Sequence, residues 1–310
     1  MSPEEASRIL SDQGAHNFIG LRSVLEHATT EWMITFLNCD GLQHIVARLR
    51  ECTKPGTLSH LDDAVVAIDG ARCLRAVMNR SEGMDYLVHS DNDCVQDMTL
   101  SLDSYHLILK QHIWELLSAV CLYSQPGRMR VISALENYAL IKACRYRFSL
   151  VIQELAFVDC PGFYYLAVIT FVNSLLKTND FEQRLRIRRE LVALGILEEI
   201  GILRDRACDS ELMYQIDLFS LNHAEDWSEF SMAPVNLLDA RSVFDALFDK
   251  TCRTPLSDRL LSVMQLLLAI DGTIELQEQL WSYQTKHQTH YGHQADLQGP
   301  LKIHSSPQHD

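Results

Sequence analysis

The feature that most constrains this chain is a helical pattern of apolar residues that recurs along the sequence. In the stretch CLRAVMN the apolar positions are Cys73, Leu74, Val77 and Met78, which share one face of a helix. A shift of 43 residues places them on Leu116, Leu117, Val120 and Cys121, and a further 55 on Phe171, Val172, Leu175 and Leu176. A looser copy, LLSVMQLLLAIDG, spans Leu260–Gly272. The first two copies are each followed by a polar stretch and a glycine, Gly83 and Gly127.

The spacing of apolar residues is helical along nearly the whole chain, and few stretches alternate with a period of two. The 8 prolines and 13 glycines fall mainly between the predicted helices, which indicates an all-α fold. Repeats of roughly 40–47 residues are typical of armadillo and HEAT arrays. We therefore expect an armadillo-like α-solenoid, a superhelical stack of four to five helical repeats. The alternative is a helical bundle without repeats.

Composition excludes several classes of partner. The formal charge of −14 argues against nucleic acid or an anionic membrane as the main partner, because both require clustered Lys and Arg. No apolar run reaches the roughly 18–20 residues of a membrane span. The N-terminus lacks the pattern of a secretory signal. The nine cysteines lie singly, without a C-x-x-C pair, as in a reduced cytoplasmic protein.

The residues between the apolar positions form a second pattern. Spacings of i, i+3, i+4 and i+7 give one polar stripe on each repeated helix. In a stacked array such stripes line up on the concave surface, where solenoids bind their ligands. The centres of the stripes are small (Ala76, Ala119, Ser174), which predicts a shallow groove for a partner helix. An ordinary solvated face is the alternative. The expected groove residues are Arg72, Arg75, Ala76, Asn79, Glu115, Ser118, Ala119, Leu122, Thr170, Asn173, Ser174 and Lys177.

No catalytic motif, metal-ligand spacing or cofactor motif is present, so we expect no enzyme activity, metal or cofactor. Carboxylates such as those of HAEDWSEF (His223–Phe230) are expected on exposed faces or in loops. FEQRLRIRRELVALG (Phe181–Gly195) carries four arginines, for which we expect pairing with Glu182 and Glu190 within one helix.

Several segments together resemble the diaphanous-inhibitory, armadillo-repeat (FH3) region of formins, most of all its inverted-formin subgroup. They are CLRAVMNRSEGMDYLV, ELLSAVCLYSQPG, YRFSLVIQEL, LRIRRELVALGILEEI and VFDALFDKTCRTPLSDRLLSVMQLLL. The resemblance runs in order from about Asn17 to Trp281. It implies a non-catalytic regulatory domain in the cytoplasm, associated with the actin cytoskeleton. In the family, the concave surface binds a short amphipathic helix with adjacent basic residues. That helix comes from the C-terminal end of the same polypeptide or its dimer mate, and the contact restrains actin assembly, so actin is an indirect partner.

The chain departs from the family pattern in several ways, and one is that it lacks the proline-rich and actin-binding homology regions. Asn173-Ser174 stands where the family usually has Asn-Ala. Only about 16 residues precede the first recognisable helix, so control by a Rho-family GTPase is doubtful. A His-rich tail, with His287, His290 and His293, replaces the dimerisation helices.

We expect a flexible segment 1–16, the repeat domain 17–284 and a disordered tail 285–310. The chain is a fragment of a longer formin or a free-standing module. Two rival functions remain: a scaffold for another actin-regulatory partner or a GTPase, and a metal protein or enzyme that uses the tail.

Overall fold

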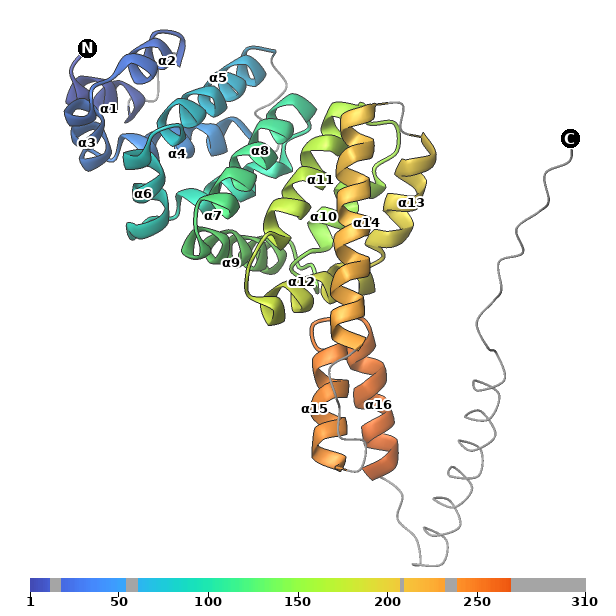
Figure 1. Cartoon of the computed structure of the whole chain (residues 1–310). Helices are drawn as coiled ribbons and strands as arrows, with labels where there is room; N and C mark the ends of the chain where they lie inside the picture. The colour runs from blue at the N-terminus through green and yellow to red at the C-terminus, as the bar shows by residue number, and fades with distance from the viewer. Residues whose placement is uncertain (12–17, 54–60, 207–208, 232–238, 269–310) are drawn as a thin grey trace, which may run out of the picture. The chain divides into compact units, whose positions relative to one another are not determined.

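The computed structural model describes residues 1–11, 18–53, 61–206, 209–231 and 239–268. These residues form sixteen α-helices and one 3₁₀ turn, without a strand (Figure 1). They fall into two units, Met1–Pro255 and Leu256–Asp310. In the second unit the described part is α16 (Leu256–Leu268), none of whose side chains is buried.

The first unit contains fifteen helices. They are α1 (Pro3–Ser11), α2 (Phe18–His27), α3 (Thr30–Asn38), α4 (Gly41–Thr53), α5 (Leu61–Met78), α6 (Ser81–His89), α7 (Cys94–Leu100), α8 (Leu107–Tyr123), α9 (Gln125–Ile141), α10 (Ser149–Ala156), α11 (Gly162–Leu176), α12 (Phe181–Ala193), α13 (Ile196–Arg206), α14 (Ser210–Ser231) and α15 (Ala240–Thr251). The 3₁₀ turn η1 (Ser101–Asp103) follows α7.

The helices of the first unit stack as three-helix repeats, α3–α5, α6–α8, α9–α11 and α12–α14, preceded by α1 and α2. The third helix of each repeat packs against the third helix of the next, so that α2, α5, α8, α11 and α14 form one continuous row (Figure 1). The other helices pack similarly, with α3 on α6, α4 on α7, and α10 on α13. This arrangement confirms the predicted armadillo-like solenoid.

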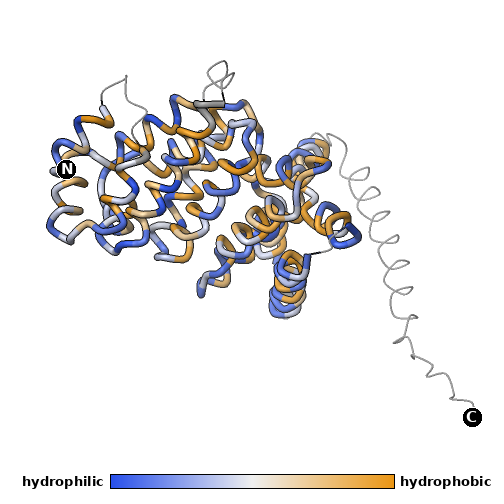
Figure 2. The backbone as a smooth tube through the Cα atoms, turned by 90° about the horizontal axis from the view of Figure 1, so that it is seen from above, coloured by the Kyte–Doolittle hydropathy of each residue, from blue (hydrophilic) through white to orange (hydrophobic). Residues whose placement is uncertain are grey.

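The repeated apolar residues form the core between successive helices. All twelve of the positions related by the two shifts are buried. The largest side chains lie between α8 and α11, where the Trp114 and Phe171 ring centroids are 4.7 Å apart. The Trp114 indole N–H also donates to the Tyr164 hydroxyl over 3.3 Å. Apolar and hydrophilic segments alternate along the stacked helices, as expected for helices buried on one side (Figure 2).

Gly83 and Gly127 occupy the same place in successive repeats, the third position of the first helix. A Cβ added at Gly83 would lie 2.2 Å from the carbonyl oxygen of Val77, and one at Gly127 would lie 2.5 Å from that of Val120. Val77 and Val120 are themselves equivalent under the 43-residue shift. Each glycine therefore lets the first helix of a repeat pack closely against the C-terminal end of the row helix before it, α6 against α5 and α9 against α8.

Three expectations about the organisation of the chain need correction. Residues 3–11 of the expected flexible N-terminus form α1, whose Ala6 and Leu10 are buried against α3 and α4. The helix that follows α11 in the row is α14, whereas the described part of the looser copy, Leu260–Leu268, belongs to α16 of the second unit. His223–Phe230 belongs to α14 and is not a loop. The expected tail 285–310, with its histidines, lies outside the described residues, as do residues 269–284 of the expected repeat domain.

Candidate ligand groove

The expected stripes lie on neighbouring helices of the row. Arg72, Arg75 and Ala76 are on α5, with Asn79 just beyond its end. Glu115, Ser118, Ala119 and Leu122 are on α8. Thr170, Asn173 and Ser174 are on α11, with Lys177 just beyond. Because α5 packs on α8 and α8 on α11, the three stripes are adjacent in space.

The first and second stripes are joined by an ion pair. Arg75 on α5 donates to the carboxylate of Glu115 and, over 3.1 Å, to Nδ1 of His112, both on α8. Gln111 donates a further hydrogen bond of 2.7 Å to Glu115. The nearby His112 ring, with Nδ1 3.6 Å from the carboxylate, together with the hydrogen bonds from Arg75 and Gln111, lowers the pKa of Glu115 to about 2. Arg72 is exposed and pairs with Asp69 of its own helix over 3.1 Å.

The uncharged residues of the stripes differ in their exposure. Ala76, Ser118 and Ser174 are buried, whereas Ala119 and the larger Leu122 are exposed. The Ser118 hydroxyl donates to the carbonyl oxygen of Trp114 and the Ser174 hydroxyl to that of Thr170, each over 2.7 Å. Since these hydroxyls are already hydrogen-bonded within their helices, the serine at position 174 leaves no donor without a partner.

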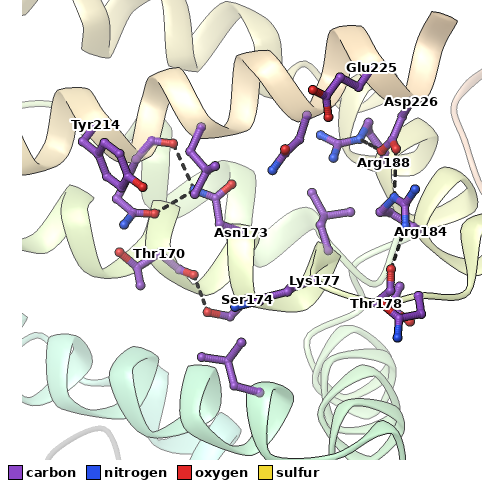
Figure 3. Close-up of a pocket in the computed structure, with 16 residues that line it drawn as sticks. Thr170, Asn173, Ser174, Lys177, Thr178, Arg184, Arg188, Tyr214, Glu225 and Asp226 are labelled. Atoms are coloured by element: carbon purple, nitrogen blue, oxygen red, sulfur yellow. Dashed lines mark hydrogen bonds and ion pairs between the residues drawn. The ribbon is translucent and has the colours of Figure 1, made fainter. Parts of the chain in front are cut away.

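The third stripe is joined to α14, a helix that the sequence analysis did not include. The Asn173 side-chain amide donates to the carbonyl oxygen and to Oε1 of Gln215, over 3.0 and 2.9 Å. Tyr214, Gln215 and Leu218 of α14 line the same pocket as Asn173, and Figure 3 shows Tyr214 and Asn173 there. The spacing of Tyr214, Leu218 and Asn222 is itself helical, and this signal was missed because the following segment was assigned to a loop.

A pocket of about 580 Å³ opens where α8, α11, α12 and α14 meet (Figure 3). Five of the expected groove residues line it: Leu122, Thr170, Asn173, Ser174 and Lys177. The other seven (Arg72, Arg75, Ala76, Asn79, Glu115, Ser118 and Ala119) do not, although Glu115, Ser118 and Ala119 share α8 with Leu122.

The end of this pocket is charged. Arg184 and Arg188 of α12 donate to opposite oxygens of the Asp226 carboxylate on α14, over 2.8 and 2.6 Å. Asp226 and Arg188 are almost completely buried. Two of the four arginines of α12 therefore pair with a carboxylate on another helix, contrary to the expected pairing within α12.

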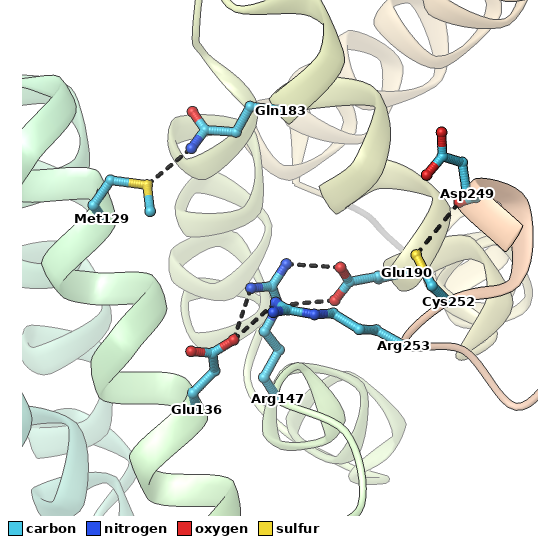
Figure 4. Close-up of polar contacts among 8 residues, drawn as sticks. All are labelled: Met129, Glu136, Arg147, Gln183, Glu190, Asp249, Cys252 and Arg253. Atoms are coloured by element: carbon cyan, nitrogen blue, oxygen red, sulfur yellow. Dashed lines mark hydrogen bonds and ion pairs between the residues drawn. The ribbon is translucent and has the colours of Figure 1, made fainter. Parts of the chain in front are cut away.

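A second polar network ties α9, α12 and the end of α15 together (Figure 4). Arg147 binds Glu190 through two hydrogen bonds of 2.7 and 2.8 Å and also donates to Glu136 over 3.0 Å. Arg253 donates to the same Glu136 oxygen over 2.9 Å. Burial raises the pKa of Glu190, although Arg147 acts in the opposite direction. Glu190, like Asp226, thus pairs with arginine between packed elements, but unlike Asp226 it does not line the pocket.

The described residues contain no group of His, Cys, Asp and Glu side chains able to hold a metal ion. His287, His290 and His293 lie outside the described part of the chain. No described helix is long and apolar enough to cross a membrane.

The fold defines a helical-repeat protein of the armadillo-like class. Two family models match the sequence: the Diaphanous GTPase-binding Domain over residues 2–122 and the Diaphanous FH3 Domain over residues 128–289. The chain therefore belongs to the formins, as a regulatory region made of these two domains. Control by a Rho-family GTPase was expected to be doubtful because few residues precede the first helix, but the GTPase-binding family model covers residues 2–122, which include the first repeats themselves.

Relatives and a solved structure agree with this family. Inverted formin-2 of Xenopus laevis is 31% identical over 282 residues, which is 90% of this chain and 25% of that protein. Formin-F of Dictyostelium discoideum is 22% identical over 270 residues, 84% of this chain and 22% of that protein. The chain thus spans about a quarter of the length of these relatives. The crystal structure of E. histolytica Formin1 bound to EhRho1-GTPgammaS has the same fold, with a TM-score of 0.61 and 14% identity over 74% of this chain and 79% of that one.

Proposed function

We propose that this chain is a non-catalytic, autoinhibitory interaction domain of a formin. Its groove on α5, α8, α11 and α14 binds an amphipathic, basic helix from the C-terminal part of a formin, and that contact restrains actin assembly. The protein then acts in the cytoplasm, on the cytoskeleton. The observation that supports this proposal most strongly is the pocket of about 580 Å³, because residues from two expected stripes line it together.

The groove has the chemistry that such a helix requires. Leu122 (50% exposed) and Tyr214 (63% exposed) offer apolar surface beside the uncharged side chains of Thr170 and Asn173. An amphipathic helix buries its apolar face on such a surface and keeps its charged residues at the rim. The net charge of −14 favours a ligand that carries Lys or Arg.

The proposal is tested with overlapping peptides of the C-terminal part of inverted formin-2 from Xenopus laevis. Binding of fluorescent peptides is measured by anisotropy for the wild type, Ala119→Asp and Leu122→Asp. Both replaced side chains are exposed, so the fold should remain intact, while a carboxylate facing an apolar anchor should weaken binding at least about tenfold. Ser174→Asp should also abolish binding, but Ser174 is buried, and this variant needs a check of its thermal stability.

The matched control is Ala156→Asp, which introduces the same charge at an exposed position of α10, outside the row. Its affinity should equal that of the wild type. Equal affinities for Ala119→Asp, Leu122→Asp and the wild type would show that the peptide binds elsewhere.

A second candidate function is binding of a Rho-family GTPase. It is supported by the GTPase-binding family model over residues 2–122 and by the GTPase named in the structure of E. histolytica Formin1. Pull-down of GTP-loaded and GDP-loaded Rho-family GTPases separates the two functions. Retention of the GTP-loaded form alone supports GTPase control, and retention of neither form removes this candidate.

A further inference from the structure

Positive charge accumulates at the end of the groove where α11 leads into α12. Arg128 of α9 is 6% exposed and donates to the carbonyl oxygen of Lys177. Its Nε has no hydrogen-bond partner, and among the described residues it has no carboxylate partner. A buried guanidinium without a carboxylate is costly, because it has lost its hydration.

The neighbouring arginines of α12 add to this positive charge. Arg184 and Arg188 share the single carboxylate of Asp226. Arg188 is 2% exposed, lines the pocket and has one terminal nitrogen, Nη1, without a hydrogen-bond partner. Burial also lowers the pKa of Arg188, which indicates that its charge is incompletely compensated.

Lys177 completes the cluster at the pocket surface. Its side chain is exposed, lines the pocket and forms no ion pair with any described residue. Glu225, on α14, lies across the pocket from it (Figure 3). Three cations, Lys177, Arg184 and Arg188, thus line the pocket with two carboxylates, Asp226 and Glu225, and Arg128 lies behind them on the Lys177 carbonyl oxygen, in a chain that is strongly acidic as a whole.

We propose that this end of the groove is an anion subsite that accepts one carboxylate side chain of the docked helix. The inference rests on the proposed function and adds to it. Besides basic residues, the ligand must carry an Asp or Glu, and the position of that residue sets the direction in which the helix lies. Glu225 favours a carboxylate over a phosphate group, because it would repel a dianion more strongly than a single charge.

The test is a double-mutant cycle on the binding peptide. Each Asp and Glu of the peptide is replaced in turn by Asn or Gln, and Kd is measured for the wild type, Lys177→Gln and Lys177→Gln/Arg184→Gln. At one acidic position of the peptide, the replacement should raise the Kd for the wild type about fivefold. The same replacement should change the Kd for the double variant by less than about twofold. If no acidic position shows this coupling, the subsite does not exist.

Lys250→Gln on α15 is the matched control, since it removes one exposed positive charge outside the groove. Replacing the same acidic residue of the peptide should weaken binding to Lys250→Gln about fivefold, as it does for the wild type. Loss of the coupling in Lys250→Gln as well would show a general charge effect and overturn the proposal.

Failure of the proposed function is recognised separately, because then no peptide binds the wild type. In that case the anion subsite is decided with acetate, a single-charged carboxylate, as the probe. Acetate should raise the Tm, relative to chloride at equal ionic strength, more for the wild type and Lys250→Gln than for Lys177→Gln. Equal shifts in all three proteins would overturn the subsite.

Discussion

Asp226 shows at the scale of a residue how one carboxylate can decide the stability of a helical repeat. It is 4% exposed and binds two arginines of the neighbouring helix. Its pairing could not be assigned from the sequence, where it is one carboxylate of a polar octapeptide. The adjacent Glu225 is exposed, has no ion pair among the described residues and provides a natural comparison.

Asp226→Asn should therefore lower the free energy of unfolding by about 3–5 kcal/mol, because Arg184 and Arg188 would be left without a carboxylate. Glu225→Gln should change it by about 0.5 kcal/mol or less. Urea denaturation followed by circular dichroism measures both values. Equal stabilities of the two variants would show that the buried pairing contributes nothing.

Glu115 should make stability depend on pH in a defined range. Its pKa falls from 4.5 to about 2 on folding, so its contribution is fully present above about pH 4.5 and is lost as the pH falls toward 2. The wild type should be more stable than Glu115→Gln at pH 6, and the difference should shrink between pH 4.5 and 2. Urea denaturation at a series of pH values measures this difference, and a constant value across the range would contradict the prediction.

At the scale of elements, the glycines at the start of α6 and α9 explain why the repeats fold alike. Both lie against the carbonyl of an equivalent valine in the preceding row helix. A methyl group at either position would collide with backbone atoms, which cannot move aside as a flexible side chain could.

Gly83→Ala and Gly127→Ala should each destabilise the protein by about 1–3 kcal/mol because the crossing helices must separate. Gly201→Ala on α13 is the control. A Cβ there meets nothing within 4 Å, and alanine should stabilise the helix by up to about 1 kcal/mol. Thermal unfolding should separate the variants in sign, and a Gly83→Ala protein as stable as the wild type would contradict the close crossing.

At the scale of the whole molecule, the net charge of −14 should govern encounter with a basic ligand. The association rate of a peptide that binds the groove should fall as salt rises from about 50 to 300 mM, because the Debye length shortens. A peptide with its Lys and Arg replaced by Gln should show little dependence on salt. Stopped-flow fluorescence measures both rates, and equal salt slopes would show that steering by charge is absent.

The repeat architecture could be predicted because stacking imposes one local requirement on each helix, an apolar face at helical spacing. All twelve aligned apolar positions, from Cys73 to Leu176, are buried as that requirement demands. The same reasoning failed at Leu260–Gly272, where no described apolar residue of α16 is buried, because apolar spacing alone does not say where a helix docks.

Only part of the pocket lining could be predicted, because the spacing within one helix does not show which other helix packs beside it. Helical spacing placed Leu122, Thr170, Asn173, Ser174 and Lys177 on adjacent stripes, and they line one pocket.

The helical pattern, its repetition and the resemblance to the family can be read from the sequence. Only the folded chain shows that α14 completes the pocket and that Asp226 is shared by Arg184 and Arg188. The physical reason is distance along the chain: an apolar periodicity is written within a single helix, whereas an ion pair between residues 38 or 42 positions apart depends on how successive helices stack.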